Sequence, residues 1–262
     1  GHKYGHDMVY DHMALDGLED AYEKGRSMGT FAEATAEKYG FTRKEQDDYA
    51  ITSLTRAQNA ATSGHFADEI TPVTYATRKG DVTIDADEQP PKSKPEKIPT
   101  LRPAFAKDGT VTAAHSASIS DGAAALVMMR ASEAKKRGLK PLAKIVGQAT
   151  HAQEPCWFTT APIDAIKKVL GKTGWSVGDV DLWEINEAFA VVAMAAIRDL
   201  ELDHAKVNVH GGACALGHPI GATGARLLVT LIHALKTHGG TKGVASLCIG
   251  GGEATAVAIE LI

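Results

Sequence analysis

The sequence is poor in three features that would each point to a particular class of protein. It holds only three cysteines in 262 residues, too few for a disulfide framework, so we expect a reducing compartment, namely the cytoplasm. Its formal net charge of −4 provides no electrostatic footprint for nucleic acid or a membrane surface. Its longest apolar run, residues 188–197, is about half of what spans a bilayer. We therefore predict neither a nucleic-acid partner nor a membrane partner.

Two short helices are predicted in the first quarter of the chain, after an exposed loop and a brief helix within residues 1–29. One runs from Thr30 to Gly40 and the other from Thr42 to Gly64. Each begins with a threonine that has a glutamate three residues later, which is the capping-box pattern. Each ends at a glycine, the preferred residue for a C-terminal cap. Neither helix carries evident chemistry.

A proline-rich, locally basic segment follows two β-like stretches after residue 70. Five of the ten prolines lie within residues 90–103, so we expect a long exposed excursion and no helix. Its cations include Lys92 and Lys94. The segment is either a solvated loop or a platform for a phosphate-bearing ligand, and the composition leaves both interpretations open.

Strands and helices alternate from residue 120 onward, which indicates an α/β layered fold. The predicted strands are Ala125–Met129, Ala143–Thr150, Val180–Ile185, Lys206–Val209 and Gly243–Ile249. The predicted helices are Ser132–Arg137, Ile163–Gly171, Glu187–Leu200 and one that begins at about Ala222.

A histidine and a cysteine each lie beside a glycine-rich loop in the C-terminal third. His218 lies in NVHGGACALGHPIGATGAR, residues 208–226, where five glycines allow close approach of a ligand. Cys248 ends a buried-type strand and is followed by the glycine run 250–252. A potential base and a potential thiol at two strand ends predict acyl-transfer chemistry.

Three blocks in this region resemble a known family. NEAFA at residues 186–190, GHPIGATGAR at 217–226 and CIGGG at 248–252 are similar, in order and spacing, to the C-terminal signature blocks of the thiolases. The likeness is greatest to the acetyl-CoA acetyltransferase branch, and it extends over the whole chain.

This resemblance implies an α/β thiolase fold, in which two βαβαβαββ halves form α-β-α-β-α layers. The chain would contain the loop domain and the C-terminal half. Residues 1–119 would form the loop domain, with substrate and oligomer contacts. Residues 120–140 would be the last strand and helix of the N-terminal half, and residues 141–262 the C-terminal half.

The same resemblance implies an acyl-CoA C-acyltransferase that cleaves or condenses short-chain 3-oxoacyl-CoA. Acetyl-CoA and coenzyme A would be substrates or products, with no permanently bound cofactor and no metal. His218 would activate a nucleophilic cysteine, and Cys248 would move the proton at the Cα atom of acetyl-CoA. Asn186 would hold a water in one oxyanion hole, or it would be a helix N-cap. The N–H of Gly250 would serve a second oxyanion hole.

Substrate-contacting residues also follow from the resemblance. Met28, Phe105, Phe158 and Phe189 would line the acyl pocket, although each is equally compatible with an ordinary core. Phe158 stands where the family often has methionine, which leaves the preferred chain length open.

The sequence departs from the family where coenzyme A would bind. Ala117 replaces a serine that touches the pantetheine, and the neighbouring His115 and Ser116 are also unusual. Pro90 stands where an arginine often meets a CoA phosphate, so Lys92 or Lys94 would take that part.

Three alternatives compete with this interpretation. His210, Cys214 and His218 have zinc-ligand types at helical spacing, but the intervening glycines disfavour a helix. A non-catalytic, lipid-carrier-like thiolase relative would be expected to lose some of the site residues. A ketoacyl synthase relative would lack Cys248.

The nucleophilic cysteine of the family belongs to an N-terminal half that we do not find in these residues. We therefore expect the 262 residues to be inactive alone and to need that N-terminal portion as a partner. The complete enzyme is expected to be a homotetramer.

Overall fold

A mixed β-sheet forms the centre of the C-terminal half of the chain. The structure, a computed structural model, describes residues 2–262. The sheet has the strand order β3-β6-β5-β4. Its strands are β3 (Ala143–Ala152), β4 (Leu182–Ile185), β5 (Lys242–Ile249) and β6 (Glu253–Leu261). β4 and β5 are parallel, whereas β6 is antiparallel to both of its neighbours.

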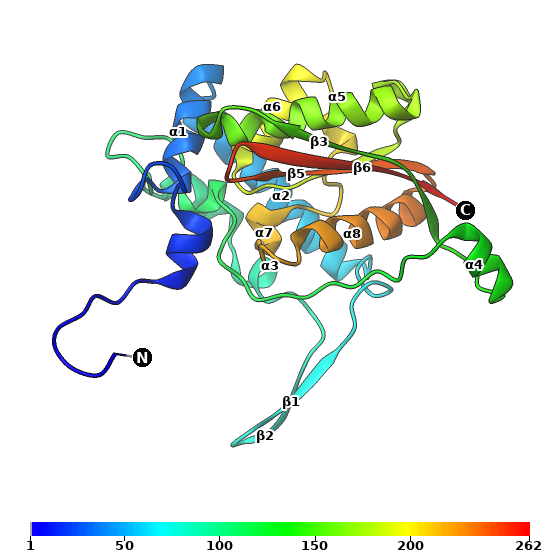
Figure 1. The fold of residues 1–262 in the computed structure, drawn as a ribbon, viewed down its shortest axis with the longest axis horizontal. Coiled ribbons are helices and arrows are strands. Elements are labelled where there is room, and N and C mark those ends of the chain that lie inside the picture. The colour runs from blue at the N-terminus through cyan, green and yellow to red at the C-terminus, as the bar shows by residue number, and fades with distance from the viewer. Residues whose placement is uncertain (1) are drawn as a thin grey trace.

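Helices cover both faces of this sheet (Figure 1). Helices α5 (Ala161–Thr173) and α6 (Ala190–Asp199) lie on one face, and α8 (Thr223–His238) lies on the other. Because successive side chains of a strand point to opposite faces, Val244 of β5 joins the core under α5 and Ala245 joins the core under α8. The predicted α/β layering is confirmed.

The strand predicted at Lys206–Val209 is wrong. Only Val207 pairs there, as an isolated parallel bridge to Trp183 of β4. The next residue, Asn208, has a left-handed φ of 48°, and its side-chain amide takes over the pairing. Its Oδ1 accepts from the Ile185 N–H at 2.8 Å and its Nδ2 donates to the Ile185 carbonyl at 2.8 Å. The Asn208 side chain thus makes the hydrogen bonds to β4 that the backbone of a neighbouring strand would have made.

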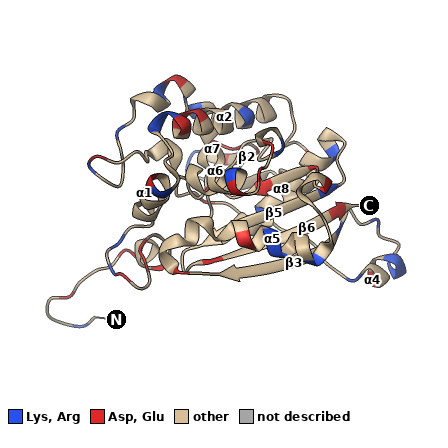
Figure 2. Cartoon of the chain, turned by 90° about the horizontal axis from the view of Figure 1, so that it is seen from above, with Lys and Arg blue, Asp and Glu red and all other residues tan. Residues whose placement is uncertain are grey.

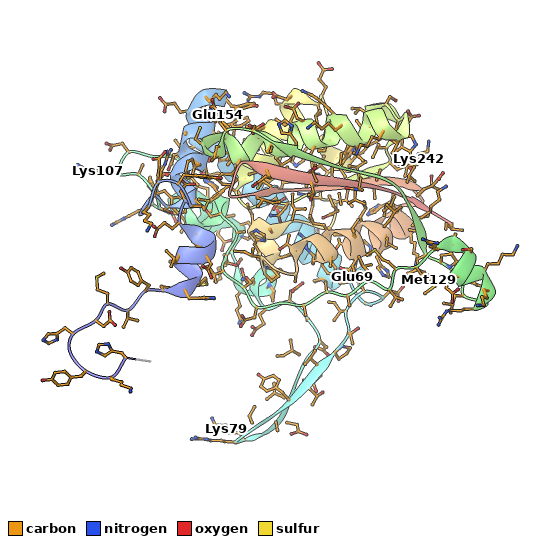
Figure 3. The ribbon with its side chains drawn as sticks, viewed as in Figure 1. Glu69, Lys79, Lys107, Met129, Glu154 and Lys242 are labelled. Carbon is orange, nitrogen blue, oxygen red and sulfur yellow. The ribbon has the colours of Figure 1, made fainter. Side chains whose placement is uncertain are left out.

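The strand predicted at Ala125–Met129 is also wrong. This segment is extended, but it pairs with no strand among residues 2–262. Val127 is 90% exposed and Met128 is 69% exposed. Met129 marks the end of this segment before the short helix α4 (Ala131–Lys136) (Figure 3). An apolar stretch does not form a strand without a neighbour that accepts its hydrogen bonds.

Helices α1 (Met28–Tyr39) and α2 (Arg43–Thr62) pack beside the sheet domain. The capping box of α2 is confirmed, because the Thr42 side chain accepts from the Glu45 N–H while Glu45 accepts from the Thr42 N–H. The capping box predicted for α1 is wrong: α1 begins two residues before Thr30. Glu33 instead accepts hydrogen bonds from two backbone N–H groups of residues 110 and 111.

The two β-like stretches form a hairpin that projects from the body of the molecule (Figure 1), with Lys79 near its tip (Figure 3). Its strands are β1 (Val73–Thr77) and β2 (Gly80–Ile84). The proline-rich segment then forms α3 (Gln89–Lys92) and a 3₁₀ turn, Pro95–Thr100. The expectation of no helix is therefore wrong, because proline is tolerated in the first turn of a helix, where its missing N–H has no intrahelical acceptor.

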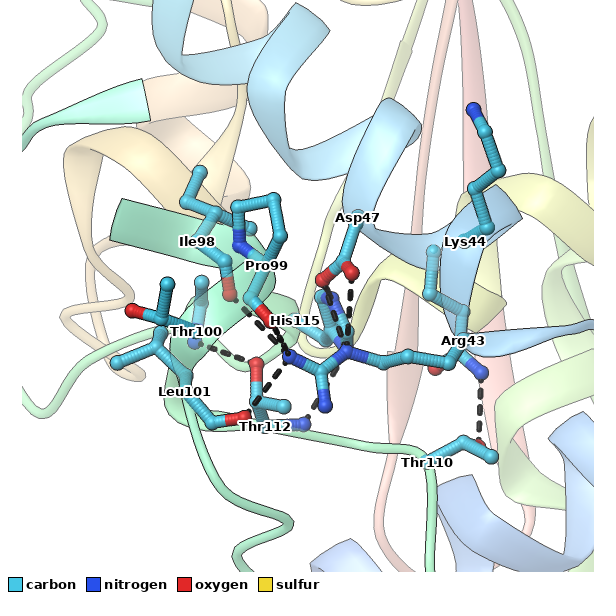
Figure 4. A network of polar contacts seen from close by, with 12 residues as sticks. Arg43, Lys44, Asp47, Ile98, Pro99, Thr100, Leu101, Thr110, Thr112 and His115 are labelled. Atoms are coloured by element: carbon cyan, nitrogen blue, oxygen red, sulfur yellow. Dashed lines mark hydrogen bonds and ion pairs between the residues drawn. The ribbon is translucent and has the colours of Figure 1, made fainter. Parts of the chain in front are cut away.

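A polar network fastens the proline-rich segment to α2 (Figure 4). Arg43 donates through Nη2 to the carbonyls of Ile98 and Leu101 at 3.2 and 2.9 Å, and through Nε to Asp47. Asp47 also lies 2.8 Å from Nε2 of the fully buried His115, whose Nδ1 accepts from the Thr112 N–H. The unusual His115 therefore has a structural role, and burial lowers its pKa.

Side chains of both charge signs are distributed over the outer helices, as α2 shows (Figure 2). Within residues 2–262, no helix combines the length and the apolar character that crossing a bilayer requires.

Candidate active site

His218 is held in one orientation and one tautomer by its surroundings. It lies between the one-turn helix α7 (Ala213–Leu216) and α8, and its N–H donates to the Ser118 carbonyl at 3.1 Å. Its Nδ1 lies 2.6 Å from Oγ1 of Thr223, whose hydroxyl donates to the Pro219 carbonyl. With the single hydroxyl proton donated to that carbonyl, Nδ1 is assigned the ring proton. Nε2 therefore keeps a free lone pair.

Burial and charge favour the neutral form of this imidazole. Burial, and secondarily the positive charge of Arg226, lower the pKa of His218 to about 4. The ring is consequently unprotonated at neutral pH and available as a base.

Asn186 lies next to Nε2 of His218. Its Nδ2 is 3.4 Å from Nε2, and its Oδ1 is buried without a hydrogen-bond partner in the described residues. The backbone of Asn186 continues β4 and donates to the Ser246 carbonyl of β5. The N-cap interpretation is wrong, because α6 begins at Ala190 with Phe189 as its N-cap. The helix predicted from Glu187 starts three residues too early.

Cys248 lies at the end of β5 and is buried, with 8% of its surface exposed. Burial raises the pKa of its thiol to about 12, so it holds its proton at neutral pH. Asn186 follows β4 and Cys248 lies one residue before the end of β5, and the carboxyl ends of these neighbouring parallel strands meet at one edge of the sheet. Such an edge is the usual position of a site in α/β folds.

The glycine turn after Cys248 is closely packed against α1. A Cβ atom on Gly250 would lie 3.1 Å from Sδ of Met28, so a side chain there would displace that methionine. Gly252 has a φ of +96°, and its carbonyl accepts from the Gln153 N–H. The turn thus requires glycine for conformation at one position and for space at the other.

The four predicted pocket residues belong to, or pack against, one large buried cluster that also contains Cys248. Met28, Phe158 and Phe189 belong to the same buried cluster as Cys248, and the partly buried Phe105 packs against it. The rings of Phe105 and Phe189 meet edge-on, with centroids 5.8 Å apart. Their roles as pocket residues stay a prediction.

Ala117 and Lys92 lie on segments that adjoin the loop of His218. The Ala117 N–H donates to the Ala188 carbonyl at 3.1 Å. Gln89, in the same short helix as Lys92, donates to Ser120 at 2.9 Å and also contacts Ser118. Lys92 itself is exposed, with Nζ 3.2 Å from Glu88.

The zinc alternative is wrong for the described residues, which contain no group of three potential metal ligands. His210 instead lies against His238, with their Nε2 atoms 3.1 Å apart. Cys214 contacts Glu187 through its backbone N–H.

Sequence reasoning missed two residues that organise the site. Thr223 selects the tautomer of His218, and its position five residues later gave no spacing signal. Glu187 is a fully buried acidic residue, and its place inside NEAFA, next to an apolar helix, was a signal that could have identified it.

The comparisons with known proteins agree with this geometry. Residues 1–132 match the family model "Thiolase, N-terminal domain", and residues 139–261 match "Thiolase, C-terminal domain". The acetyl-CoA acetyltransferase of Rhizobium meliloti is 49% identical over 99% of this chain. The cytosolic acetyl-CoA acetyltransferase of Mus musculus is 47% identical over 99% of it. The chain spans 66% of each of these relatives.

Solved structures show the same similarity. The Bacillus anthracis acetyl-CoA acetyltransferase superposes with a TM-score of 0.94 at 45% identity, covering all of this chain and 66% of that one. The Acat5 thiolase from Ascaris suum, in complex with coenzyme A, has a TM-score of 0.88 at 41% identity. That superposition covers 99% of this chain and 66% of the other.

Proposed function

Because this chain belongs to the thiolase family, we propose that it supplies the acid–base side of an acyl-CoA C-acyltransferase site. The reaction is thiolysis of a short-chain 3-oxoacyl-CoA, or the reverse Claisen condensation of two acetyl-CoA molecules. The observation that carries the proposal is the set of groups at the edge of the sheet where β4 and β5 end. A neutral imidazole with a free Nε2, a buried amide and a protonated thiol lie at the loop and strand ends where an acyl group would be transferred.

In thiolysis, a cysteine thiol loses its proton to Nε2 of His218 and attacks the 3-oxo carbon of the substrate. The Cα–Cβ bond then breaks, leaving an acyl-enzyme thioester and the enolate of acetyl-CoA. The protonated Nε2 donates to the enolate oxygen, and Cys248 donates its proton to Cα. Coenzyme A finally attacks the thioester; its thiol proton restores the Cys248 thiol, and the protonated His218 returns its proton to the released cysteine sulfur.

Asn186 and Gly250 serve the oxyanions of these steps. The Asn186 amide beside Nε2 would hold a water or donate directly to the enolate oxygen, and the Gly250 N–H would donate to the oxygen of the tetrahedral intermediate. Donors placed in advance for developing negative charge are the most effective part of such sites.

We place the nucleophilic cysteine outside the 262 residues. Cys214 donates its thiol to the Glu187 carbonyl, and burial beside the Glu187 carboxylate raises its pKa well above the usual value. The surroundings of Cys214 thus disfavour a thiolate, and Cys248 is already assigned to the carbon proton. The Cys156 thiol lies 3.9 Å from a carboxylate oxygen of Glu154, with no other base placed to accept its proton in the contacts it makes within residues 2–262. The partner that we propose is an N-terminal portion that carries this cysteine; the relatives, of which the chain spans 66%, are long enough to contain one.

The test is thiolysis of acetoacetyl-CoA by this chain alone and by the chain joined to that N-terminal portion. We expect no turnover by the chain alone and CoA-dependent turnover by the joined protein. Mass spectrometry after incubation with acetyl-CoA locates the acyl group. An acetylated Cys156, with turnover lost in Cys156→Ser, would contradict our placement of the nucleophile.

A non-catalytic acyl-CoA or lipid-binding protein is the alternative. The complete set of His218, Asn186 and Cys248 supports the enzyme, since a pure binding protein needs no base with a selected tautomer. Binding of acetyl-CoA by the joined protein without any turnover would favour the alternative.

We also propose that the complete enzyme is a cytoplasmic homotetramer. The cytosolic relative from Mus musculus supports the location. The exposed apolar side chains Tyr4, Val9 and Tyr10 near the start of the chain support subunit contacts. Light scattering of the joined protein measures the assembly.

A further inference from the structure

Glu187 is a fully buried carboxylate that joins four separate segments beneath the candidate active site. Its Oε1 accepts from the hydroxyl of Tyr49 at 2.9 Å and from Nδ2 of Asn208 at 2.8 Å. Its Oε2 accepts from the hydroxyl of Ser53 at 2.8 Å and from the N–H of Cys214 at 3.1 Å. These donors come from α2, from Asn208 beside β4 and from α7.

The pattern of partners makes each oxygen of Glu187 an acceptor. Each oxygen faces one donor that cannot reverse its polarity, Asn208 Nδ2 at Oε1 and the Cys214 N–H at Oε2. None of the four partners is a cationic side chain, so hydrogen bonds alone satisfy the buried carboxyl group. The position cannot be filled by a neutral amide without placing one donor against another.

Space around the carboxylate is equally restricted. A Cβ atom on Gly212 would overlap the Glu187 carboxylate, and the Gly212 N–H donates to Oγ of Ser53 at 3.0 Å. The first turn of the loop that leads to His218 therefore lies directly on Glu187. On its other side, Glu187 is bonded in sequence to Asn186.

We propose that Glu187 is a positioning residue that holds Asn186 and the His218 loop in register with each other. The Asn186–His218 pair is separated by 32 residues and meets at 3.4 Å. Glu187 is the group that connects the neighbour of one to the loop of the other, and α2 supports both through Tyr49 and Ser53. This inference rests on the proposed function, because it concerns the geometry of the same site.

The test is Glu187→Gln in the joined protein, which keeps the size of the side chain and removes the acceptor pattern. We expect kcat for acetoacetyl-CoA thiolysis to fall about a hundredfold, as small misplacements of reacting groups do, with KM within about threefold. The matched control is Asp181→Asn. Asp181 accepts from the N–H groups of Thr241 and Lys242 at the opposite end of the same strands, so its loss should lower stability without lowering kcat.

A second readout does not depend on activity. In the 262-residue chain, the ¹⁵N spectrum of His218 should show a single Nδ1–H tautomer, and Glu187→Gln should give a mixture of tautomers. If Glu187→Gln does not fold, Ser53→Ala removes one link to the loop and should lower kcat several-fold with the same tautomer mixing.

The outcomes separate the two proposals. Absence of turnover in the unsubstituted joined protein overturns the proposed function, and the tautomer spectra then still decide the role of Glu187. The inference is overturned if Glu187→Gln and Ser53→Ala both keep a single His218 tautomer and a kcat as high as that of Asp181→Asn. Glu187 would then only stabilise the fold.

Discussion

At the scale of the residue, burial acts in opposite directions on the two groups proposed to move protons. It lowers the pKa of His218, which keeps the imidazole neutral, and it raises the pKa of Cys248, which keeps the thiol protonated. One apolar environment therefore yields a ready proton acceptor and a ready proton donor. This pairing is what a step that removes one proton and delivers another requires.

The depressed pKa of His218 predicts the acid limit of activity. The base form should persist until the pH falls to about 4, so the acid limb of kcat/KM should lie well below pH 6.5. Between these values the unfolded chain binds a proton that the native chain does not, so the His218 contribution to stability falls as the pH falls through this window. Arg226→Gln removes the positive charge that helps to lower the pKa of His218, so this pKa should rise in the variant.

An NMR titration of the His218 ring measures this pKa directly in the unsubstituted protein and in Arg226→Gln. An unchanged titration in Arg226→Gln would contradict the assigned influence of Arg226.

Separate substitutions should distinguish the two proton-transfer roles. His218→Ala should abolish both acylation and condensation in the joined protein, since one base serves the sulfur atoms. Cys248→Ser should leave acylation of the nucleophile measurable and abolish proton exchange at Cα of acetyl-CoA. Each rate should fall roughly 10²- to 10⁴-fold. Single-turnover kinetics measures acylation, and deuterium exchange measures proton transfer at Cα. Equal losses of both steps in Cys248→Ser would refute its separate role.

At the scale of the element, the capping box of α2 should be measurable on its own. Thr42→Ala removes the side-chain acceptor for the Glu45 N–H and should cost about 1 kcal/mol of unfolding free energy. Thr42→Ser keeps the hydroxyl oxygen and is the matched control, so its unfolding free energy should fall by only about a few tenths of a kcal/mol. Urea denaturation measures both. The same loss in both variants would mean that the threonine methyl, and not the cap, stabilises the helix.

The short helix α3 carries the proposed contact to a CoA phosphate. Lys92 is exposed and is already close to Glu88, so its contribution is that of a screened surface charge. Lys92→Ala with Lys94→Ala should raise KM for acetyl-CoA by roughly two- to fivefold at low salt, since such pairs contribute about 1 kcal/mol or less. The difference should vanish at high salt. If KM and its salt dependence do not change, the segment is a solvated loop.

At the scale of the whole molecule, residues 125–129 form an extended apolar segment that pairs with no strand among residues 2–262. The 90% exposure of Val127 predicts that the N-terminal portion of the complete enzyme supplies the adjoining strand. Amides of this segment should exchange with deuterium within seconds in the 262-residue chain and far more slowly in the joined protein. Amides of β5, which is paired on both sides, serve as the control. Equally fast exchange in the joined protein would exclude pairing there.

The sequence by itself determined the elements whose signals are local. The cap of α2 at Thr42, the alternating layers of the C-terminal half and the amphipathic helix α5 follow from patterns within a few residues of each other. The three motif blocks likewise indicated His218, Asn186 and Cys248, because their glycines and polar residues are close in the chain.

Only the tertiary structure decided features that depend on distant partners. Glu33 binds the backbone at residues 110 and 111 and caps no helix, and Asn208 replaces a strand by pairing its amide with Ile185. The tautomer of His218 follows from one Thr223 proton, and the role of Glu187 follows from four donors on three segments. Such contacts are absent from any local pattern, because hydrogen bonds between residues far apart in the chain exist only after packing has brought them together.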